Sequence, residues 1–397
     1  MTTQVHPVPA LIGRLQQAAL AVGIVGLVAC AAGGFASPGQ FFSSYLFGFL
    51  FWTGVGIGCL SISMIHHLSG GAWGLLIRRI LEAGARTLPY AALAFIPVAL
   101  GVKQIYVWAS PAHDEAMREV LAKKEAYLNV PFFLGRAAFY FVAWSFLGHL
   151  LSKWSLEQEQ GGDKERLAGR MRGLAGGGLV VMGLTITFAA VDWAMSLEPH
   201  WFSTIYGVLF MVGQALSAMA LVIALLSLIG TEEPLAGVVS SRSVHDLGKL
   251  LFAFVMLWAY VNLSQFLIIW SGNLPEEIPW YVHRLSGGWQ WMALLLVVFH
   301  FVLPFMLLLS RDLKRNGRVL GLVAGGIFFA RIVDLYWLVG PELHGQGGLA
   351  FHWMDVAAPV GLGGLWLGVF LWQLKGRPLL ATGDPEFAET FAAAEGH

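Results

Sequence analysis

The sequence predicts an all-α integral membrane protein with about ten transmembrane helices. Of its 397 residues, 57% are hydrophobic and only 12% are charged, whereas globular proteins carry about 25% charged residues. Apolar stretches long enough to cross the hydrocarbon core, which takes about 20 residues each, recur along the chain. Basic and acidic residues balance at 24 each, so the charge argues against a nucleic-acid partner. Most of the chain is therefore expected to lie in lipid.

The apolar stretches can be placed in order along the chain. They lie at residues 12–33, 42–65, 87–109, 130–151, 174–196, 203–229, 247–271, 287–309, 318–340 and 351–374. The 48 glycines suit close packing between such helices. The second to fifth and the sixth to ninth helices are expected to form two four-helix bundles, flanked by the first and the last. Residues 1–397 thus form one polytopic membrane domain that ends in a cytoplasmic tail at 375–397.

The loops between these helices differ in basic charge, which predicts the orientation. Lys and Arg are concentrated in the even-numbered loops and in the tail, for example at Arg79, Arg311 and Arg377, and Arg14 lies near the N-terminus. Because the side rich in Lys and Arg faces the cytoplasm, both termini are expected there. Residues 67–86 mix charged and apolar side chains and are expected to form a short amphipathic helix on the cytoplasmic surface.

Ionisable and amide side chains fall inside the predicted helices, where a charge at the bilayer centre costs about 2.5–3.5 kcal/mol. They are Lys103, His149, Asp192, Gln214, Gln265, His300, Arg331, Asp334, His352 and Asp355. Most of them fall in the half of the membrane away from the cytoplasm, and the cost of burying Asp192 is expected to be shared within this outer group. The distribution predicts two half-channels for protons, joined through His300 and Gln214.

A structural explanation stays open for several of these groups. Arg331 and Asp334 are three residues apart on one helical face and would form a neutral pair that holds its helix in register. His352 and Asp355 would simply lie at the membrane interface, in contact with water. The sequence does not separate these roles from proton transfer.

The cysteines and histidines give no sign of a resident redox cofactor. Cys30 and Cys59 both lie in apolar runs, and the sequence contains no C-x-x-C-H motif for covalent haem. A haem b held by two histidines would need a matched pair on facing helices, and His66, His149 and His300 do not repeat at such a spacing. No cofactor or metal is therefore expected in this chain.

Two segments carry a resemblance to a known family. They are residues 191–201, VDWAMSLEPHW, and residues 264–281, SQFLIIWSGNLPEEIPWY. Together with the length and the ten-helix layout, they resemble the ActF-type subunit of bacterial alternative complex III, the smaller of its two NrfD-like (polysulfide-reductase-like) membrane subunits. The second segment is long and specific, and the first is moderately so.

The resemblance implies a subunit of a respiratory complex in a bacterial inner membrane. Such complexes oxidise quinol and pass electrons through iron–sulfur clusters and c-type haems to an acceptor. Those groups would lie in partner subunits, which also include a larger NrfD-like sister subunit. This chain would carry no redox cofactor, would stabilise the membrane arm and would offer a path for protons.

Two alternatives remain beside this interpretation. In the first, the chain itself binds and oxidises quinol near the outer face, with Asp192, His352 and Asp355 as candidate bases. In the second, it is a free-standing transporter, a class whose helices are often broken at mid-membrane. Pro97 and Pro304 are the candidates for such breaks near mid-helix, and the pattern favours the respiratory subunit.

Overall fold

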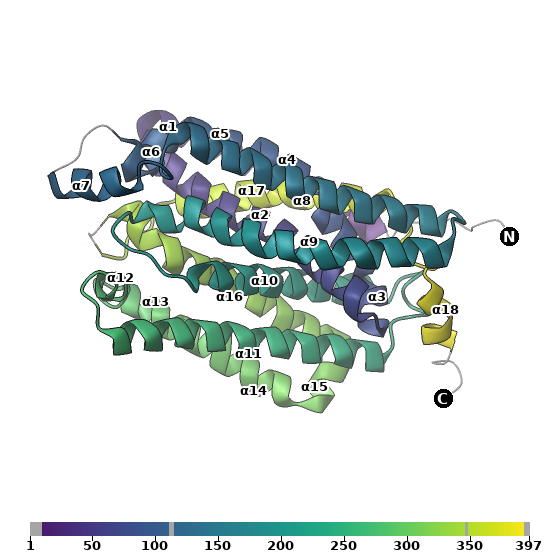
Figure 1. Cartoon of the computed structure of the whole chain (residues 1–397). Coiled ribbons are helices and arrows are strands. Elements are labelled where there is room, and N and C mark those ends of the chain that lie inside the picture. The colour runs from purple at the N-terminus through teal and green to yellow at the C-terminus, as the bar shows by residue number, and fades with distance from the viewer. Residues whose placement is uncertain (1–9, 111–114, 346–347, 393–397) are drawn as a thin grey trace.

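The structure is a computed structural model that describes residues 10–110, 115–345 and 348–392, and these consist of helices joined by turns and loops, without strands (Figure 1). Ten helical segments in these ranges are long and apolar enough to cross a membrane. They are Ala10–Ala36, Pro38–Ser69, Ala72–Leu100, Val130–Glu159, Lys164–Leu197, Tyr206–Ile229, Ser241–Gly272, Trp289–Leu309, Gly317–His344 and Met354–Lys375. The prediction of an all-α, multi-pass membrane protein is confirmed.

Most of these segments are one continuous helix, but some are divided into shorter pieces. In chain order the elements are α1 (Ala10–Ala36), α2 (Pro38–Ser69), α3 (Ala72–Ala85), α4 (Leu88–Ala94), α5 (Ile96–Leu100), α6 (Val102–Ile105), η1 (Val107–Ala109), α7 (Glu115–Lys124), α8 (Val130–Glu159), α9 (Lys164–Trp193), η2 (Met195–Leu197), α10 (Tyr206–Ile229), α11 (Ser241–Gly272), α12 (Ile278–Arg284), α13 (Trp289–Leu295), η3 (Leu296–Val302), α14 (Leu303–Leu309), α15 (Arg311–Arg315), α16 (Gly317–His344), α17 (Met354–Lys375) and α18 (Pro385–Ala392). Pro89, Pro97 and Pro304 open α4, α5 and α14, because proline has no N–H to continue the preceding helix.

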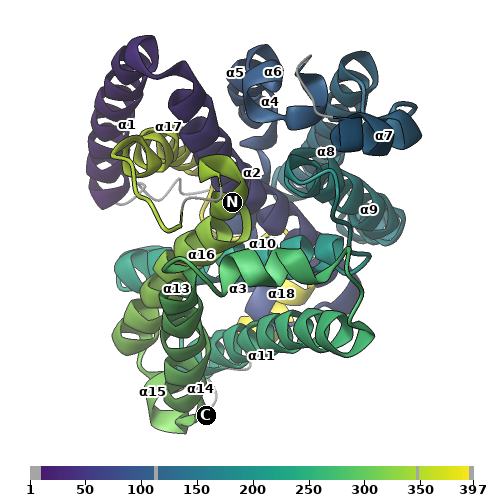
Figure 2. The same ribbon diagram turned by 90° about the vertical axis from the view of Figure 1, so that its left-hand side faces the viewer.

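The α2 helix lies at the centre of the molecule and is buried along most of its length. It packs against α3, α9, α10 and α17. With α2, the segments α3–α5, α8 and α9 form one four-helix bundle, while α10, α11, α13–α14 and α16 form the second (Figure 2). The α1 helix packs along α17, to one side of α2. The two bundles and the flanking pair expected from the sequence are therefore present.

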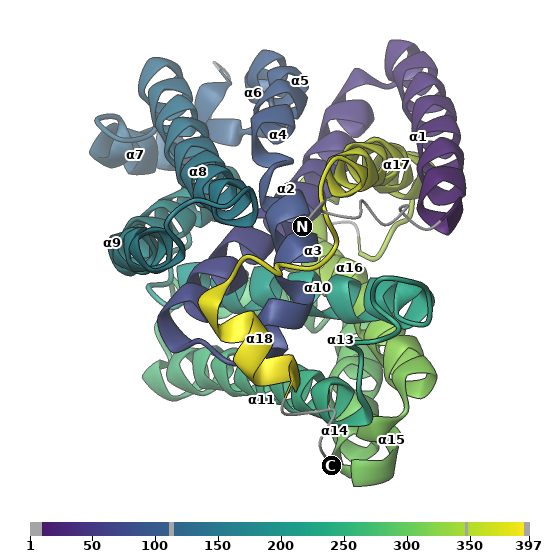
Figure 3. The same cartoon turned by 90° about the vertical axis from the view of Figure 1, so that its right-hand side faces the viewer.

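The helices run side by side, so the molecule has two ends. One end carries α7 and α12 and is called the α12 end; the other carries α15 and α18 and is called the α18 end (Figures 1 and 3). The tail turns back over the α18 end, where Arg377 donates to the Ser152 carbonyl oxygen at 2.6 Å and Asp384 pairs with Arg78 at 2.5 Å. The last five residues of the tail, 393–397, lie outside the described residues.

The segment 67–86 contains a helix as expected, but this helix does not lie on the surface. The α3 helix is buried over almost its whole length and opens the third span at Ala72, so that this span is Ala72–Leu100 and not 87–109. Its charges are neutralised internally: Arg78 and Arg79 bond Glu82 at 3.1 and 2.9 Å. The prediction of a surface helix is wrong because hydropathy treats each charge alone, whereas paired charges can be buried.

Glycines allow α1 and α17 to approach closely. A Cβ atom at Gly364 would lie 2.4 Å from the Ala19 carbonyl oxygen and from Gly23. Gly364→Val is therefore expected to push the two helices apart and to destabilise the chain by about 1–3 kcal/mol, the usual range for overpacking. Thermal unfolding of the detergent-solubilised chain measures the effect. The control is Gly183→Val, where a Cβ meets nothing within 4 Å; equal losses in the two variants would contradict the packing argument.

Candidate functional site

The buried Asp192 carboxylate is held within the first bundle. Arg136 of α8 donates to both of its oxygens, from Nη2 to Oδ1 at 2.7 Å and from Nε to Oδ2 at 2.9 Å. The Tyr140 hydroxyl also donates to Oδ2, at 2.7 Å, and the Arg136 guanidinium stacks over the Tyr127 ring at 3.8 Å. A bidentate pair of this kind fixes both partners in one geometry. Asp192 thus belongs to a closed contact between α8 and α9.

Arg331 and Asp334 form an ion pair within α16, in agreement with their spacing, and both are buried in the second bundle. The Trp258 indole Nε1 donates to Asp334 Oδ2 at 3.0 Å, and Arg331 Nε donates to the Ser217 hydroxyl at 3.4 Å. The His300 ring packs on Trp258, with 4.0 Å between ring centroids, and both of its nitrogens are buried without a hydrogen-bond partner. We call these five residues the His300 cluster. Helices α10, α11 and α16 and the η3 segment contribute to it.

The backbone around His300 is π-helical, because η3 spans Leu296–Val302 as a π-helix. Pro304 follows four residues after His300 and has no N–H to donate to the His300 carbonyl, so the regular α-helical ladder is interrupted there. π-Helical turns are rare and frequently lie at functional sites. Pro304 is therefore the sequence signal for this distortion.

Asp355 organises a third polar group where α17 meets α2 and the end of α16. Ser44 Oγ and Gln40 Nε2 donate to Asp355 Oδ1 at 2.6 and 3.0 Å. The His344 Nε2 lies 3.2 Å from Oδ2, and the backbone N–H of His352 donates to the same oxygen at 2.9 Å. His352 and Asp355 are thus neighbours, as their spacing predicts, but the contact is made by the His352 backbone. The group ties three helices together.

The remaining candidate residues stand apart from these three groups. Lys103 was expected inside the third membrane-spanning helix but lies beyond that span, in α6, and is exposed. His149 is also exposed, whereas Gln265 is buried. Gln214 lies between α10 and α2, so close to α2 that a Cβ at Gly54 would be 3.0 Å from its Cγ. The Gln214 Oε1 atom is buried without a hydrogen-bond partner.

The single outer group expected from the sequence does not form among the described residues. Asp192, Asp334 and Asp355 have separate partners, and no hydrogen bond or ion pair within those ranges joins one carboxylate's group to another. Similar depth does not bring side chains together when they project from different helices into different bundles. Each carboxylate is instead satisfied by a neighbouring helix or by its own.

A cavity of about 580 Å³ opens beside the His300 cluster. Its walls come from α11, α12, α13, η3 and α16 and are mostly apolar and aromatic, with Asp334 and Trp258 shared with the cluster. Trp258 and Arg331 both contact Oδ2 of Asp334, and the Asp334 side chain also lines the cavity. An apolar cavity with few polar groups is the usual form of a small-molecule site.

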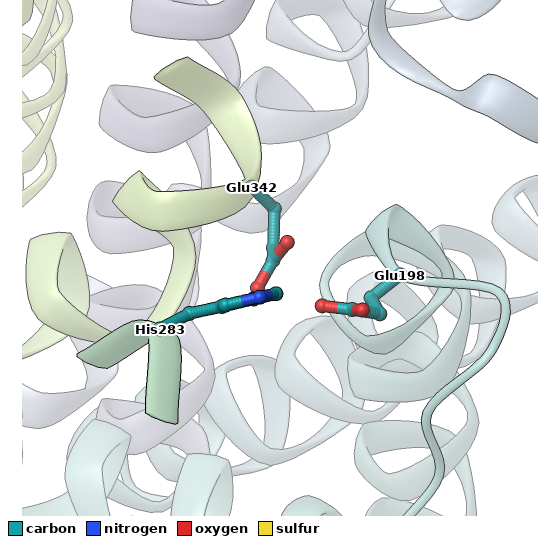
Figure 4. A group of neighbouring side chains, drawn as sticks. All are labelled: Glu198, His283 and Glu342. Carbon is teal, nitrogen blue, oxygen red and sulfur yellow. The ribbon is translucent and has the colours of Figure 1, made fainter. Parts of the chain in front are cut away.

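Three further ionisable side chains meet at the α12 end, a group that the sequence did not predict (Figure 4). Glu198 follows η2, His283 lies in α12, and Glu342 lies in the last turn of α16; one ligand atom from each lies within 4.8 Å of the others. We call them the α12-end triad. Arg284 Nη1 donates to Glu342 Oε1 at 3.0 Å. Burial, together with the charge of Glu342, raises the pKa of Glu198 to about 7.

This raised pKa predicts a pH-dependent stability in metal-free buffer. The folded state favours the protonated Glu198 carboxyl, so the free energy of unfolding falls as pH rises from about 4.5, the ordinary pKa, through about 7. Glu198→Gln removes this loss and is expected to be more stable than the unsubstituted chain above about pH 7, with the advantage fading toward about pH 4.5. Thermal unfolding across this range measures the difference. Glu276→Gln, which alters an exposed loop residue, is the control. If stability depended on pH in the same way in both variants, the dependence could not be assigned to Glu198.

Comparison with known proteins identifies no relative of this chain. No protein-family model matches the sequence, and no curated protein matches it. Two features of the described residues bear on chemistry: the His300 cluster with its cavity, and the α12-end triad.

Proposed function

We propose that the chain is an integral membrane subunit of a quinol-oxidising respiratory complex of the alternative complex III type, in which it stabilises the membrane arm and conducts protons. The resemblance of residues 191–201 and 264–281 supports the choice of complex. The single observation that carries the proton role is the His300 cluster: an ion pair and an unpartnered histidine, buried together inside membrane-spanning helices. Intramembrane ionisable residues are functional candidates because burying them is costly.

The chemistry of the cluster suits proton transfer. A neutral imidazole accepts a proton at one nitrogen and donates from the other, so an unpartnered His300 can pass a proton along. Asp334 offers a carboxylate that takes up and releases a proton, while Arg331 beside it stabilises the ionised form. Trp258 contacts both His300 and Asp334 and holds them in one layer of the bundle. Asp192 is less suited, because Arg136 and Tyr140 already occupy its oxygens.

The proposal includes the surroundings of the subunit. Both termini lie in the cytoplasm of a bacterium, so that the α18 end faces inward and the α12 end outward. A larger NrfD-like sister subunit, an iron–sulfur subunit and c-haem subunits carry the electrons, and this chain holds no redox cofactor of its own. The basic residues near the α18 end support this orientation.

A second candidate function is quinol binding in the cavity beside Asp334. The cavity opens on the side of the molecule, where Tyr260 and Leu263 are 68% and 57% exposed, so its mouth faces lipid in a membrane. A lipid-soluble quinol could enter there and donate a hydroxyl proton to Asp334. This site differs from the one suggested by sequence, which used Asp192, His352 and Asp355.

Purification of the native assembly tests the main proposal. If the chain is such a subunit, it is expected to co-purify from membranes with proteins that show c-haem absorbance and iron–sulfur signals. Recovery of the chain from native membranes under mild solubilisation, without these partner proteins, would contradict the proposal and favour a transporter.

Filling the cavity separates the two candidate functions. Ala293→Trp places an indole against the cavity wall, with Leu322→Trp on the exposed face of α16 as control. Unchanged quinol oxidation by the intact complex in both variants is the expected result for a subunit that only conducts protons. A loss of quinol oxidation confined to Ala293→Trp would instead establish this cavity as the quinol site.

A further inference from the structure

We propose that the α12-end triad, Glu198, His283 and Glu342, binds a divalent transition-metal cation, with Zn²⁺ the best match. The three side chains come from three separate parts of the chain and point toward one another (Figure 4). One imidazole nitrogen and two carboxylate oxygens are a ligand set that Zn²⁺ uses in proteins, with water in the fourth position. The site is independent of the proton role proposed for the His300 cluster.

The distances allow coordination after a small adjustment. The three ligand atoms lie within 4.8 Å of one another. Around a tetrahedral Zn²⁺ with bonds of about 2.0–2.2 Å, ligand atoms are about 3.3–3.6 Å apart. An approach of about 1 Å is therefore needed, which long Glu and His side chains can make by rotation about their terminal bonds. The triad is half-buried, so a cation can also reach it from outside.

The carboxylates of the α12-end triad favour a bound cation. The Glu198 Oε2 atom is buried without a hydrogen-bond partner. Two carboxylates face each other in the triad, and the fully buried Arg284 forms an ion pair with Glu342. When both carboxylates are ionised and His283 is neutral, Arg284 balances only one of the two negative charges. A bound dication would supply the missing positive charge and a ligand for the orphaned oxygen.

The surrounding residues hold the triad in place. Arg284 is fixed by the Leu338 carbonyl oxygen at 2.5 Å and by the Trp280 ring, which lies 3.7 Å below its guanidinium carbon. Trp280 in turn stacks on Trp201, three residues after Glu198, with 4.8 Å between ring centroids. Supporting contacts of this kind orient metal ligands and commonly change affinity about 10–100-fold when they are lost.

The choice of Zn²⁺ follows from the donor set. Imidazole nitrogen suits Zn²⁺ and related transition metals, whereas Mg²⁺ and Ca²⁺ prefer six or more oxygen ligands. The metal would also have a structural consequence. Glu198 belongs to the connection between the two bundles, while His283 and Glu342 belong to the second, so the cation would clamp the bundles together at the α12 end.

Titration of the purified full-length chain with Zn²⁺ tests the site. After chelator treatment and removal of the chelator, calorimetry is expected to show one Zn²⁺ bound per chain, and Mg²⁺ is expected to give no comparable heat. His283→Gln and Glu342→Gln are each expected to weaken binding by at least about tenfold. The matched controls are His200→Gln and Glu276→Gln, which alter exposed residues of the neighbouring loops and should leave binding unchanged.

A second measurement keeps the test decisive if a variant fails to fold. Co²⁺ added to the unsubstituted chain is expected to give visible absorption bands of a tetrahedral or five-coordinate site, which Zn²⁺ then abolishes by displacement. Absence of saturable Zn²⁺ binding by the unsubstituted chain would overturn the proposal. So would full affinity in a folded His283→Gln variant, because the zinc would then be bound elsewhere.

Discussion

Replacement of Arg136 by alanine is expected to destabilise the chain by about 3–5 kcal/mol, the cost of leaving a buried charge without its partner. Asp192 is 0% exposed, and Arg136 supplies two of the hydrogen bonds to its carboxylate. The Tyr140 hydroxyl alone cannot neutralise the remaining charge. The thermal unfolding midpoint of the purified chain in detergent, with the yield of folded protein, measures the loss.

A double variant that removes both charges tests whether stability depends on the ion pair or only on filling the two positions. The double variant Arg136→Met, Asp192→Leu is expected to recover most of the stability, because apolar side chains of similar size often replace a buried ion pair without loss. Lys123→Ala, which breaks an exposed pair with Glu119, is the control and should cost less than about 1 kcal/mol. An Arg136→Ala chain as stable as this control would contradict the assigned role of Asp192.

The helical layout could be predicted from the sequence because it depends on local apolar length. Partners of buried charges could not, since they depend on which helices become neighbours. Arg136 is 56 positions away from Asp192 and resembles a residue at the end of a loop. Likewise Arg78, Arg79 and Glu82 look like surface charges until α3 is seen to be buried with them.

The candidate site shows the same division between local and distant information. The Arg331–Asp334 pair follows from a spacing of three residues and is present. Its contact with His300 through Trp258 joins three helical segments that no local pattern relates. The triad of Glu198, His283 and Glu342 also joins distant parts of the chain that no local pattern relates, although Glu198 lies in one of the two family-like segments and the other ends just before His283. That Asp192, His300 and Asp334 lie in membrane-spanning helices could be predicted from the sequence, whereas the neighbours that each side chain meets could not.

Asp334→Asn is expected to uncouple proton movement from quinol oxidation in the intact complex. Asparagine keeps the size of the side chain and its contact with Trp258, but its amide cannot take up and release a proton near neutral pH. Positioned groups that transfer protons commonly contribute about 10²–10⁴-fold to a rate, so a loss of proton translocation of at least about tenfold is expected. Under the proposed function, electron transfer lies in partner subunits and should continue.

Asp192→Asn is the matched control for this substitution. Asp192 is another buried aspartate next to an arginine, but its carboxylate belongs to the closed contact with Arg136 and Tyr140. The control is expected to lower stability and to leave the number of protons moved per electron unchanged. A defect in assembly alone would affect both variants, whereas loss of a proton path would affect only Asp334→Asn.

The most direct test of the proton role is therefore the number of protons moved per electron, with both quantities measured on one sample. Vesicles that contain the intact complex are supplied with quinol, while acceptor reduction and the change in external pH are recorded together. The proposed function predicts that Asp334→Asn retains quinol oxidation and loses most of the protons moved per electron, with Asp192→Asn at the unsubstituted ratio. An unchanged ratio in an assembled Asp334→Asn complex would contradict proton conduction through the His300 cluster.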